Sequence, residues 1–483
     1  MPETLPATKL PIYHQSLDWD QLYREYPVPD VFAETVYKWP AARVRALQNE
    51  RFLKVVAIGW QNPFYAKRWR AAGVEPGDIK SLDDIAKLPL YNSDDVKKDQ
   101  LEHPPFGEFH NVDRDRLSAS PFKLQTSGGT TGKPRTTLYT PQEWELNGLT
   151  LARGLYILGA RPGDVMQIPA TLALGNLGWC VYKGVHDYLG ILPVTSGSGV
   201  VTPSRRQIEL AFDYGTNLWC SFPEYMMRLV QACRDEVGRD FRELNTKFIL
   251  TFLGPDTQGS LRRELEDMTG CNVYDNYGTN EMGEGAFECP AKAGLHFQED
   301  CMFFEVVDTE TGRPLPNGES GNLVVTVFHR AMPPIIRFNL RDLGRILHTD
   351  TCACGSNFRR MDHFLGRSDD MVKVRGVNVN PMACLTAIQS DERTTGEWVC
   401  LVDTIERGGA RRDEMTVQVE LKQGIAAADG LKEKLESLLR GDLGLGVTVD
   451  LVPKGSLDDL ANIGREGKAK RLRDRRAAYK GKV

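Results

Sequence analysis

The stretch QTSGGTTGKPRTT, Gln125 to Thr137, decides how this chain is interpreted. It places three glycines, five threonines and one lysine within thirteen residues. Glycines lack a Cβ atom, so backbone N–H groups can approach an anion closely, while hydroxyl groups add donors and the lysine adds a mobile positive charge. This composition indicates a loop that binds a polyphosphate. For the segment taken alone, a solvent-exposed Gly/Thr hairpin without a ligand is the alternative.

The stretch differs from a P-loop of the GxxxxGK[ST] type at two positions. Ser127 stands five positions before Gly132, and Pro134 follows Lys133. A P-loop leads into a helix, whereas the segment that follows here, PRTTLYT, is rich in residues that favour strands. We therefore expect the loop to join two strands.

Length, composition and charge exclude several classes of protein. A chain of 483 residues is too long for one core, and 41% hydrophobic with 26% charged residues is typical of a globular protein. The net charge of −5 gives no basic field for nucleic acid. No apolar run is long enough to span a membrane, and the opening MPETLPATKL does not resemble a secretion signal. We expect a cytoplasmic protein with neither nucleic acid nor membrane as a partner. Its ten cysteines are then reduced thiols or metal ligands.

Hydrophobic periodicity predicts an α/β fold of composite α+β type. The region of about residues 1–110 is helical in pattern, as in ARVRALQNERFLKVVAIGWQ. From about residue 122 to 365, apolar runs such as KFILTFLG and GNLVVTVF alternate with helical segments such as SLRRELEDMTG, which indicates sheet with flanking helices.

The last hundred residues have the pattern of a separate small α+β unit. Apolar residues in EMTVQVEL alternate with polar ones as in a strand: Met415, Val417, Val419 and Leu421. Further on, Leu431, Leu435, Leu438 and Leu439 mark a helix that we expect to end at Gly441. The charged stretch LGRSDDMVKVRG is the expected junction, which gives a large domain over residues 1–367 and a small one over residues 368–483.

A series of motifs covering residues 124 to 471 resembles the adenylate-forming superfamily of acyl-CoA synthetases, peptide-synthetase adenylation domains and luciferases. The family's phosphate loop reads [ST]SG[ST]TGxPK, and TSGGTTGKP carries one extra glycine, as in the phenylacetate-CoA ligase branch. FLGPDT, YDNYGTNE, IRFNLRD, GRSDDMVKVRGVNVNP and REGKAKR follow in the family's order. The resemblance implies a large adenylation domain and a small mobile C-terminal domain.

The resemblance also implies where ATP binds. The phosphate loop would consist of Thr126, Ser127, Gly128, Gly129, Thr130, Thr131, Gly132 and the catalytic Lys133. Gly254, Pro255 and Asp256 stand where the family has an adenine-contacting GAE, the last two as departures from it. The remaining expected nucleotide contacts are Asp275, Asn276, Tyr277, Gly278, Thr279, Asn280, Asp342 and Arg367.

Several of these residues have specific implied roles. Asp275 would face the adenine amine, Tyr277 would stack on the ring, and Glu281 would bind Mg²⁺ as a catalytic residue. Asn280 departs from the usual Ser/Thr, although an amide can still donate to phosphate. Asp342 would take both ribose hydroxyls. The alternatives are a surface carboxylate for Glu281 and an ion pair with Arg341 or Arg337 for Asp342.

The C-terminal motifs imply the catalytic lysine and the hinge. Lys468 stands at the position of the family's C-terminal catalytic lysine, with a solvated basic tail as the alternative. Asp369 corresponds to the hinge residue, with Lys373 and Arg375 in the same motif, and the pantetheine thiol of CoA would enter beside Gly376. A simple linker turn is the alternative for GRSDD.

The acyl pocket is expected along IPATLALGNLGWCVYKG and near GTNEMGEG. Leu174 and Trp179, together with glycines such as Gly283, could shape a flat slot for an aromatic or cyclic acid. These residues fit a hydrophobic core equally well, so the sequence does not identify the acid.

Two short motifs raise the question of a metal. Cys289 and His296 are spaced C-x6-H, and Cys352 and Cys354 form CxC. Together they could form a closed, structural Cys₃His site for Zn²⁺. Cys301 is a competing ligand.

The resemblance implies an ATP-dependent carboxylic acid–CoA ligase that forms AMP through an acyl-adenylate, with ATP, Mg²⁺ and CoA as its cofactors and a homodimer left open. An adenylating enzyme that passes the acyl group to a carrier protein or an amine is the second hypothesis. A nucleotide-binding protein without turnover is the third.

Overall fold

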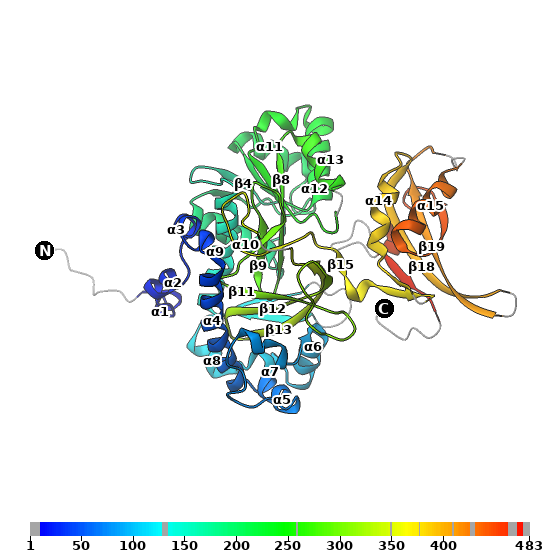
Figure 1. Ribbon diagram of the computed structural model, residues 1–483. Helices are drawn as coiled ribbons and strands as arrows, with labels where there is room; N and C mark the ends of the chain where they lie inside the picture. Colours follow the sequence, from blue (N-terminus) through cyan, green and yellow to red (C-terminus); the bar gives the residue numbers. More distant parts are fainter. Residues whose placement is uncertain are drawn as a thin grey trace. The chain divides into compact units, whose positions relative to one another are not determined.

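The computed structural model describes residues 10–127, 134–256, 259–347, 350–375, 377–407, 410–425, 430–461 and 471–476. The chain divides into two compact units. The larger takes in the described residues up to Leu340 together with Gly344–Phe364, and the smaller takes in Arg341–Leu343 and the described residues from Leu365 onward. The mixture of helices and several sheets confirms the predicted fold class (Figure 1).

The described chain begins with helices, as the sequence predicts. They are α1 (Ile12–Gln15), α2 (Trp19–Glu25), α3 (Pro29–Glu34), η1 (Val36–Lys38), α4 (Ala41–Gln61), α5 (Pro63–Ala71), η2 (Leu82–Lys87), α6 (Ser93–Glu102), α7 (Gly107–His110) and α8 (Arg114–Ala119). Ser81 and Asn92 begin two of them with capping boxes, which satisfy backbone N–H groups at the helix start. Within the described part of the chain, no helix has both the length and the apolar character needed to cross a bilayer.

An eight-stranded sheet with order β14-β10-β9-β8-β7-β6-β4-β5 forms one part of the larger unit. Five of its strands run parallel: β4 (Val165–Gln167), β5 (Leu192–Val194), β6 (Leu218–Cys220), β7 (Phe248–Thr251) and β8 (Asn272–Thr279). The antiparallel strands are β9 (Gly283–Glu288), β10 (Leu295–Phe297) and β14 (Arg360–Met361). The parallel strands end at one common edge, which is where α/β sheets bind ligands.

Helices connect these strands. They are α9 (Pro141–Ile157), α10 (Leu177–Lys183), η3 (Gly184–Tyr188), α11 (Ser204–Tyr214), α12 (Pro223–Ala232), η4 (Cys233–Val237), η5 (Phe241–Leu244) and α13 (Ser260–Thr269). Figure 1 shows α11, α12 and α13 gathered near β8. The strand and helix predicted from KFILTFLG and SLRRELEDMTG are confirmed by β7 and α13.

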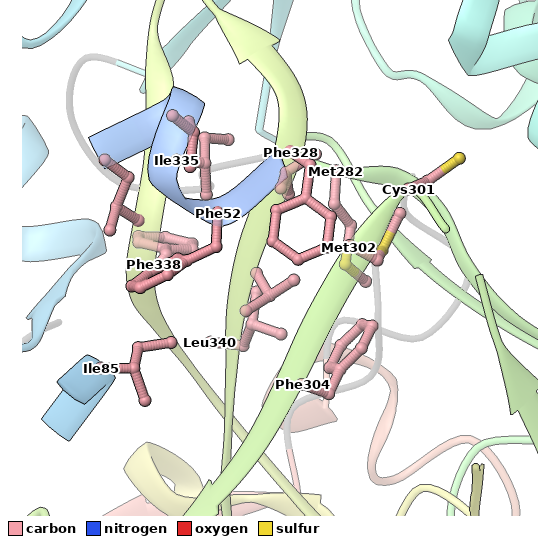
Figure 2. Close-up of a cluster of buried hydrophobic side chains, with 14 of the residues drawn as sticks. Phe52, Ile85, Met282, Cys301, Met302, Phe304, Phe328, Ile335, Phe338 and Leu340 are labelled. Carbon is pink, nitrogen blue, oxygen red and sulfur yellow. The ribbon is translucent and has the colours of Figure 1, made fainter. Parts of the chain in front are cut away.

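A five-stranded sheet, order β1-β13-β12-β11 with β15 paired to β13, packs against the N-terminal helices. Its strands are β1 (Tyr91–Asn92), β11 (Met302–Val307), β12 (Ser320–Ala331), β13 (Pro334–Arg345) and β15 (Gly366–Arg367). Figure 2 shows Phe52 of α4 and Ile85 of η2 pointing toward Phe304, Phe338 and Leu340 of the sheet. This cluster explains why the helical N-terminal region belongs to the same unit as the sheets.

The smaller unit is α+β, as predicted. A hairpin, β16 (Val372–Val374) with β17 (Val377–Val379), follows η6 (Ser368–Asp370) and precedes η7 (Pro381–Ala383) and α14 (Cys384–Gln389). Its four-stranded sheet has order β20-β19-β18-β21, with β18 (Thr394–Arg407), β19 (Ala410–Leu421), β20 (Thr448–Val452) and β21 (Leu472–Asp474). The helices are α15 (Leu431–Leu443) and α16 (Asp458–Ala461).

Two sequence predictions for this unit are tested by β19 and α15. The predicted strand is confirmed, because the side chains from Met415 to Leu421 that alternate toward the core are all buried. The predicted helix end at Gly441 is wrong: α15 continues to Leu443 and is capped by Gly444, whose φ of 62° lies in the left-handed region that glycine tolerates. Leu438 is 40% exposed and lies off the buried face of the helix.

Candidate active site

Two short strands flank the glycine-threonine loop. The strands β2 (Lys123–Thr126) and β3 (Thr136–Tyr139) pair antiparallel, and the N–H of Ser127 donates to the carbonyl of Arg135 at 3.0 Å. This confirms that the loop joins two strands. Its central residues, Gly128, Gly129, Thr130, Thr131, Gly132 and Lys133, lie outside the described residues.

The side chain of Asn280 ties the first loop strand to the end of β8. Its Nδ2 donates to the Thr126 carbonyl at 2.7 Å, and its Oδ1 accepts from the N–H of Asn176 at 3.1 Å. The hydroxyl of Tyr139, from the second loop strand, donates to the Asn280 carbonyl. Asn280 therefore connects both loop strands to the carboxyl edge of the parallel sheet, and its amide is already used for this purpose.

A second set of contacts across this edge involves Asn147, Asn176 and Leu174. The amide side chains of Asn147 and Asn176 exchange two hydrogen bonds, at 3.0 and 2.9 Å. The N–H of Thr126 donates to the Leu174 carbonyl at 2.9 Å. The loop between β4 and α10 is thus held against the loop strands, and sequence periodicity gave no signal for this network because its members are far apart in the chain.

Glu281 forms an ion pair with Arg135. Both residues are largely buried, with 6% and 8% of their surface exposed, so the alternative of Glu281 as a surface carboxylate is wrong. Arg135 stands where the family motif [ST]SG[ST]TGxPK has its final lysine, a signal that sequence reasoning missed in favour of Lys133. The pair borders a cavity of about 10 Å³, lined also by Tyr91 and Phe338, which is roughly the space of one water molecule.

Asp275 is buried at the end of the pairing between β7 and β8. Its carboxylate accepts from the N–H of Leu253 at 2.9 Å. Burial, with the charge of Glu288 as the next cause, raises the pKa of Asp275 to about 8. Glu288 is itself paired with Arg262 through two hydrogen bonds, at 2.7 and 2.9 Å. The predicted contact of Asp275 with the adenine amine stays a prediction.

The rest of YDNYGTNE is held by local contacts. Asn276 donates to Glu284 at 2.8 Å, and the Tyr277 ring stacks on Phe364 with centroids 6.3 Å apart. A Cβ at Gly278 would lie 2.6 Å from the Gly283 carbonyl, so only glycine permits this approach of β8 and β9. The Thr279 hydroxyl accepts from the N–H of Glu281 at 3.3 Å.

The described part of FLGPDT, residues 252–256, follows β7 on the way to α13. Gly254 has φ 67°, and Pro255 follows it. The Asp256 carboxylate accepts from the Ser260 hydroxyl and from the N–H of Arg262, each at 3.0 Å. Asp256 therefore stabilises the start of α13, a helix N-terminus where a negative charge is favourable.

Within the smaller unit, one arginine connects two predicted site residues. Arg367 donates to Asp342 at 3.0 Å and to both carboxylate oxygens of Asp369, at 2.8 and 2.9 Å. Burial pushes the pKa of Asp369 up, but the hydrogen bonds and charge of Arg367, with Arg341 at 3.7 Å, outweigh it and hold that pKa below its ordinary value. Arg337, the other residue considered for Asp342, pairs instead with Glu305 at 2.8 Å.

The remaining residues of the hinge motif lie in and after β16. The carbonyl of Lys373 accepts from Arg476 at 2.9 Å. Arg375 has a left-handed φ of 51° and donates to the Gly446 carbonyl. Gly376 and the catalytic candidate Lys468 lie outside the described residues.

Of the predicted acyl-pocket residues, two have local packing roles. Trp179 donates from its indole to the Ala173 carbonyl at 2.8 Å, and Lys123 Nζ lies 4.7 Å from the centre of the indole system. A Cβ at Gly283, which has φ 74°, would meet Asn147 Oδ1 at 2.5 Å. Leu174 is 53% exposed at the same edge of the sheet.

Comparison with known proteins identifies the family. Residues 38–328 match the description "AMP-binding enzyme", and residues 376–476 match "AMP-binding enzyme C-terminal domain". The chain belongs to the AMP-binding enzyme family. It falls in the adenylate-forming, phenylacetate-CoA ligase-like branch.

Relatives of this AMP-binding enzyme include named and structurally solved ligases. The chain is 31% identical to the phenylacetate-coenzyme A ligase of Aromatoleum evansii, over 92% of this chain and 97% of that protein. It resembles 2-hydroxyisobutyryl-CoA ligase in the postadenylation state with R3-HIB-AMP, at TM-score 0.78, 25% identity and 91% coverage of both chains. A second structure of that ligase, with 2-HIB-AMP and CoA, matches at TM-score 0.66 and 26% identity, again over 91% of both chains.

This AMP-binding enzyme also brings its predicted metal ligands together. One ligand atom from each of Cys289, His296, Cys352 and Cys354 lies within 4.8 Å of the other three. The Sγ atoms of Cys289 and Cys352 are 3.7 Å apart, and Cys354 Sγ lies 3.5 Å from His296 Nε2. Cys301 does not join this cluster: its Sγ lies 3.6 Å from the Arg153 guanidinium.

The cysteine pair from TCACG lies in a tight turn. The N–H of Cys352 donates to Ser356, and the N–H of Gly355 donates back to Cys352, at 2.9 and 2.8 Å. Gly355 has φ 88°, a conformation that glycine adopts without strain. The pKa of the Cys354 thiol is lowered. The largest cause is a hydrogen bond with Cys289; hydrogen bonds with His296 and Tyr37 act in the same direction, and burial opposes them. Three sulfur atoms and one imidazole nitrogen at these distances suit a cation with tetrahedral coordination.

The raised pKa of Asp275 predicts a pH dependence of stability. The folded enzyme keeps this proton up to about pH 8, whereas the ordinary pKa at which an unfolded chain releases it is 3.8. The folded state therefore binds more protons in this interval, and the contribution of Asp275 to stability is lost as the pH rises from about 4 to 8. We expect Asp275→Asn, which keeps an acceptor for Leu253, to reduce the fall in the free energy of unfolding between pH 5 and pH 8, measured by urea denaturation. If the free energy of unfolding falls as much in the variant as in the wild type, the raised pKa of Asp275 is contradicted.

Proposed function

We propose that this AMP-binding enzyme is an ATP-dependent acid–CoA ligase that forms AMP through an acyl-adenylate. The observation that carries the proposal is the attachment of both phosphate-loop strands to the carboxyl edge of the parallel sheet by Asn280, directly before Glu281. Support comes from relatives over nine-tenths of the chain that are named as CoA ligases.

The proposed reaction has two steps. The substrate carboxylate attacks the α-phosphorus of ATP, a new O–P bond forms, and pyrophosphate leaves. The CoA thiolate then attacks the acyl carbon, a thioester forms, and AMP leaves. Because the first step brings an anion toward a polyanion, we expect the enzyme to act mainly through positioning and charge neutralisation. Lys133 and Lys468 are the proposed catalytic cations, and Arg135 is a third cation beside the loop.

Glu281 is the proposed ligand for Mg²⁺. A buried carboxylate suits this hard cation, which would neutralise charge on the phosphates. In the structure the carboxylate is paired with Arg135. Binding of the ion would therefore replace the guanidinium at Glu281, and Arg135 would become available to the phosphates.

The roles proposed for the other nucleotide contacts follow the family pattern. Asp275 and Tyr277 would bind adenine, Asp342 would bind the ribose, and Arg367, which donates to Asp342, would be a further nucleotide contact. Within the motif that begins the smaller domain, which we place at residues 368–483, Asp369 would serve as the hinge residue. Lys373, Arg375 and Gly376 would lie near the entering thiol.

For the acid, we propose an aromatic or cyclic ring rather than a long chain. The indole of Trp179 and the exposed Leu174 offer apolar surface beside β2, the strand before the phosphate loop. The two remaining hypotheses, transfer to a carrier protein or amine and nucleotide binding without turnover, are outcomes of the test below.

The cysteine cluster is proposed to hold a structural Zn²⁺. Its donor set, Cys₃His, leaves no position for a substrate in a four-coordinate site. No disulfide joins any of the ten cysteines, all of which lie in the described residues; this supports a reducing compartment, and we propose the cytoplasm. The proposed partners are the acid, ATP and CoA, with neither nucleic acid nor a membrane, and a homodimer is the assembly to test by light scattering.

A panel of carboxylic acids tests the function. With ATP and Mg²⁺, an aromatic or cyclic acid is expected to give AMP release that depends on CoA. Pyrophosphate exchange that depends on the acid, without consumption of CoA, would favour the carrier-protein or amine hypothesis. Absence of exchange with every acid would favour binding without turnover.

The proposed catalytic lysine is tested with the best acid of that panel. Lys468→Ala is expected to slow adenylation by about 10²- to 10³-fold, as for the loss of one preorganised donor. Lys470→Ala, two positions along the same basic segment, is the control and is expected to keep the wild-type rate. Equal rates for both variants would refute the role of Lys468.

The metal role of Glu281 predicts a shift in Mg²⁺ dependence. In Glu281→Gln a neutral amide replaces the charged ligand, so we expect the Mg²⁺ concentration for half-maximal adenylation to rise about tenfold or more. Calorimetric titration of Mg·ATP should show the same weakening without turnover. Glu224→Gln, at an exposed position of α12, is the control. An unchanged Mg²⁺ dependence would show that Glu281 is not a metal ligand and that its role is the ion pair with Arg135.

Metal analysis tests the zinc proposal. Purified protein is expected to contain about one equivalent of zinc, because a Cys₃His site binds it tightly at neutral pH. A content below about half an equivalent, after purification without chelators, would refute the proposal.

A further inference from the structure

The hydroxyl of Tyr37 contacts the cysteine cluster from outside it. Its Oη lies 3.1 Å from Cys354 Sγ, and the ring packs edge-on against His296, with centroids 5.5 Å apart. Tyr37 belongs to η1 and is only 1% exposed. One buried side chain from the N-terminal helices therefore touches two of the four proposed ligands, 317 positions before the cysteine in the chain.

The second ring nitrogen of His296, the histidine of the cluster, has no hydrogen bond among the described residues. A metal-binding histidine usually donates from its second ring nitrogen to a carboxylate, a carbonyl or water. Here His296 presents Nε2 to Cys354, and its buried Nδ1 has no hydrogen-bond partner among the described residues. Tyr37 instead brings a polar side chain to this side of the cluster, at Cys354.

The chemistry of the pair fits a thiolate bound to a metal. A phenol with an ordinary pKa near 10 keeps its proton at neutral pH and can donate it to sulfur. Such a hydrogen bond would fix the direction of the Cys354 side chain and stabilise the sulfur in its charged form, which is the form that binds zinc.

We propose that Tyr37 is a positioning residue for the zinc ligand Cys354, so that metal binding and the packing of the segment Pro29–Lys38 are coupled. The inference rests on the proposed zinc site. The segment packs on the turn that carries the cysteines: the Phe32 ring lies 6.0 Å from that of Phe358, and Asn357 donates to the Trp39 carbonyl at 3.1 Å. Losing the metal would loosen both sides of this contact.

An open cleft gives access to the cluster on this face. It has a volume of about 370 Å³ and is lined by Glu34, Tyr37, Lys38, Arg161 and Cys354, among others. Cys354 is the least buried of the four ligands, and the other three are buried. A chelator can therefore approach the metal through the side of the site that Tyr37 supports.

The experiment compares zinc retention in Tyr37→Phe and in the wild-type protein. The substitution removes the hydroxyl and keeps the ring, so the packing with Phe32 and Phe358 is preserved. We expect zinc affinity, measured by competition with a chromogenic chelator, to fall about 10- to 100-fold, as for other outer contacts of metal ligands. Zinc release should accelerate correspondingly.

Tyr26→Phe is the matched control. Tyr26 is 3% exposed, follows α2, and packs against His329 and Arg51 rather than against the cysteines. We expect it to retain zinc as the wild type does. If both tyrosine variants retain zinc equally well, Tyr37 has a packing role only and the inference is overturned. If the wild type itself lacks zinc, the zinc proposal fails first.

A double-mutant cycle separates positioning from general destabilisation. Zinc affinity is measured in Cys354→Ala with and without Tyr37→Phe. If the hydroxyl acts through Cys354, its removal has little further effect once the sulfur is absent. An equal loss of affinity in both backgrounds would show that Tyr37 acts through the fold as a whole, and would overturn the inference.

Discussion

The candidate active site depends on the two hydrogen bonds that the side-chain amide of Asn280 makes. The amide joins the strand before the phosphate loop to the loop after β4, while Tyr139 holds the backbone of the same asparagine from the strand after the loop. A glycine-rich loop has little conformational preference of its own, so its position is determined by where its two ends are attached. Both ends are attached at the edge where the parallel strands finish.

Buried charge is the second constraint on this edge. Glu281, the last residue of YDNYGTNE, pairs with Arg135, and Glu288 of the next strand, β9, pairs with Arg262. An unpaired charge in such surroundings would be costly, whereas a hydrogen-bonded pair is tolerated. Burial raises the pKa of Asp275, although the nearby charge of Arg262 acts in the opposite direction. The motif therefore contains one carboxyl group that is paired with an arginine and another whose pKa is raised by burial.

The sequence predicted the large-scale organisation and the positions of single elements well. The α/β class, the strands around the loop, β19 and the helix α13 follow from periodicity and from local turn residues, which act over short distances. The end of α15 could not be predicted in this way, because a glycine inside a helix and a glycine at its cap look alike in sequence. The grouping of the four metal-ligand candidates was predicted from their residue types and from the C-x6-H and CxC spacings, and it is confirmed.

What the sequence could not predict are contacts that depend on packing between distant elements. The partner of Glu281, the Asn147–Asn176 pair and the approach of Tyr37 to Cys354 join positions separated by 146, 29 and 317 residues. The residue types involved occur throughout the chain, so nothing local distinguishes these examples. Arg135 alone could have been noticed in the sequence, because it occupies the position of the final lysine in the loop motif; its pairing with Glu281 could not.

The pairing of Glu281 with Arg135 has a consequence for the resting enzyme. An unpaired carboxylate at the position of Glu281, the proposed Mg²⁺ ligand, would repel the phosphates of an incoming nucleotide. Because the chain supplies its own positive charge, this part of the pocket is close to electrically neutral before any ligand arrives. If Glu281 has the role proposed above, an arriving Mg²⁺ ion must compete with the Arg135 guanidinium for this carboxylate, and the buried pair keeps its charge balanced when free magnesium is scarce.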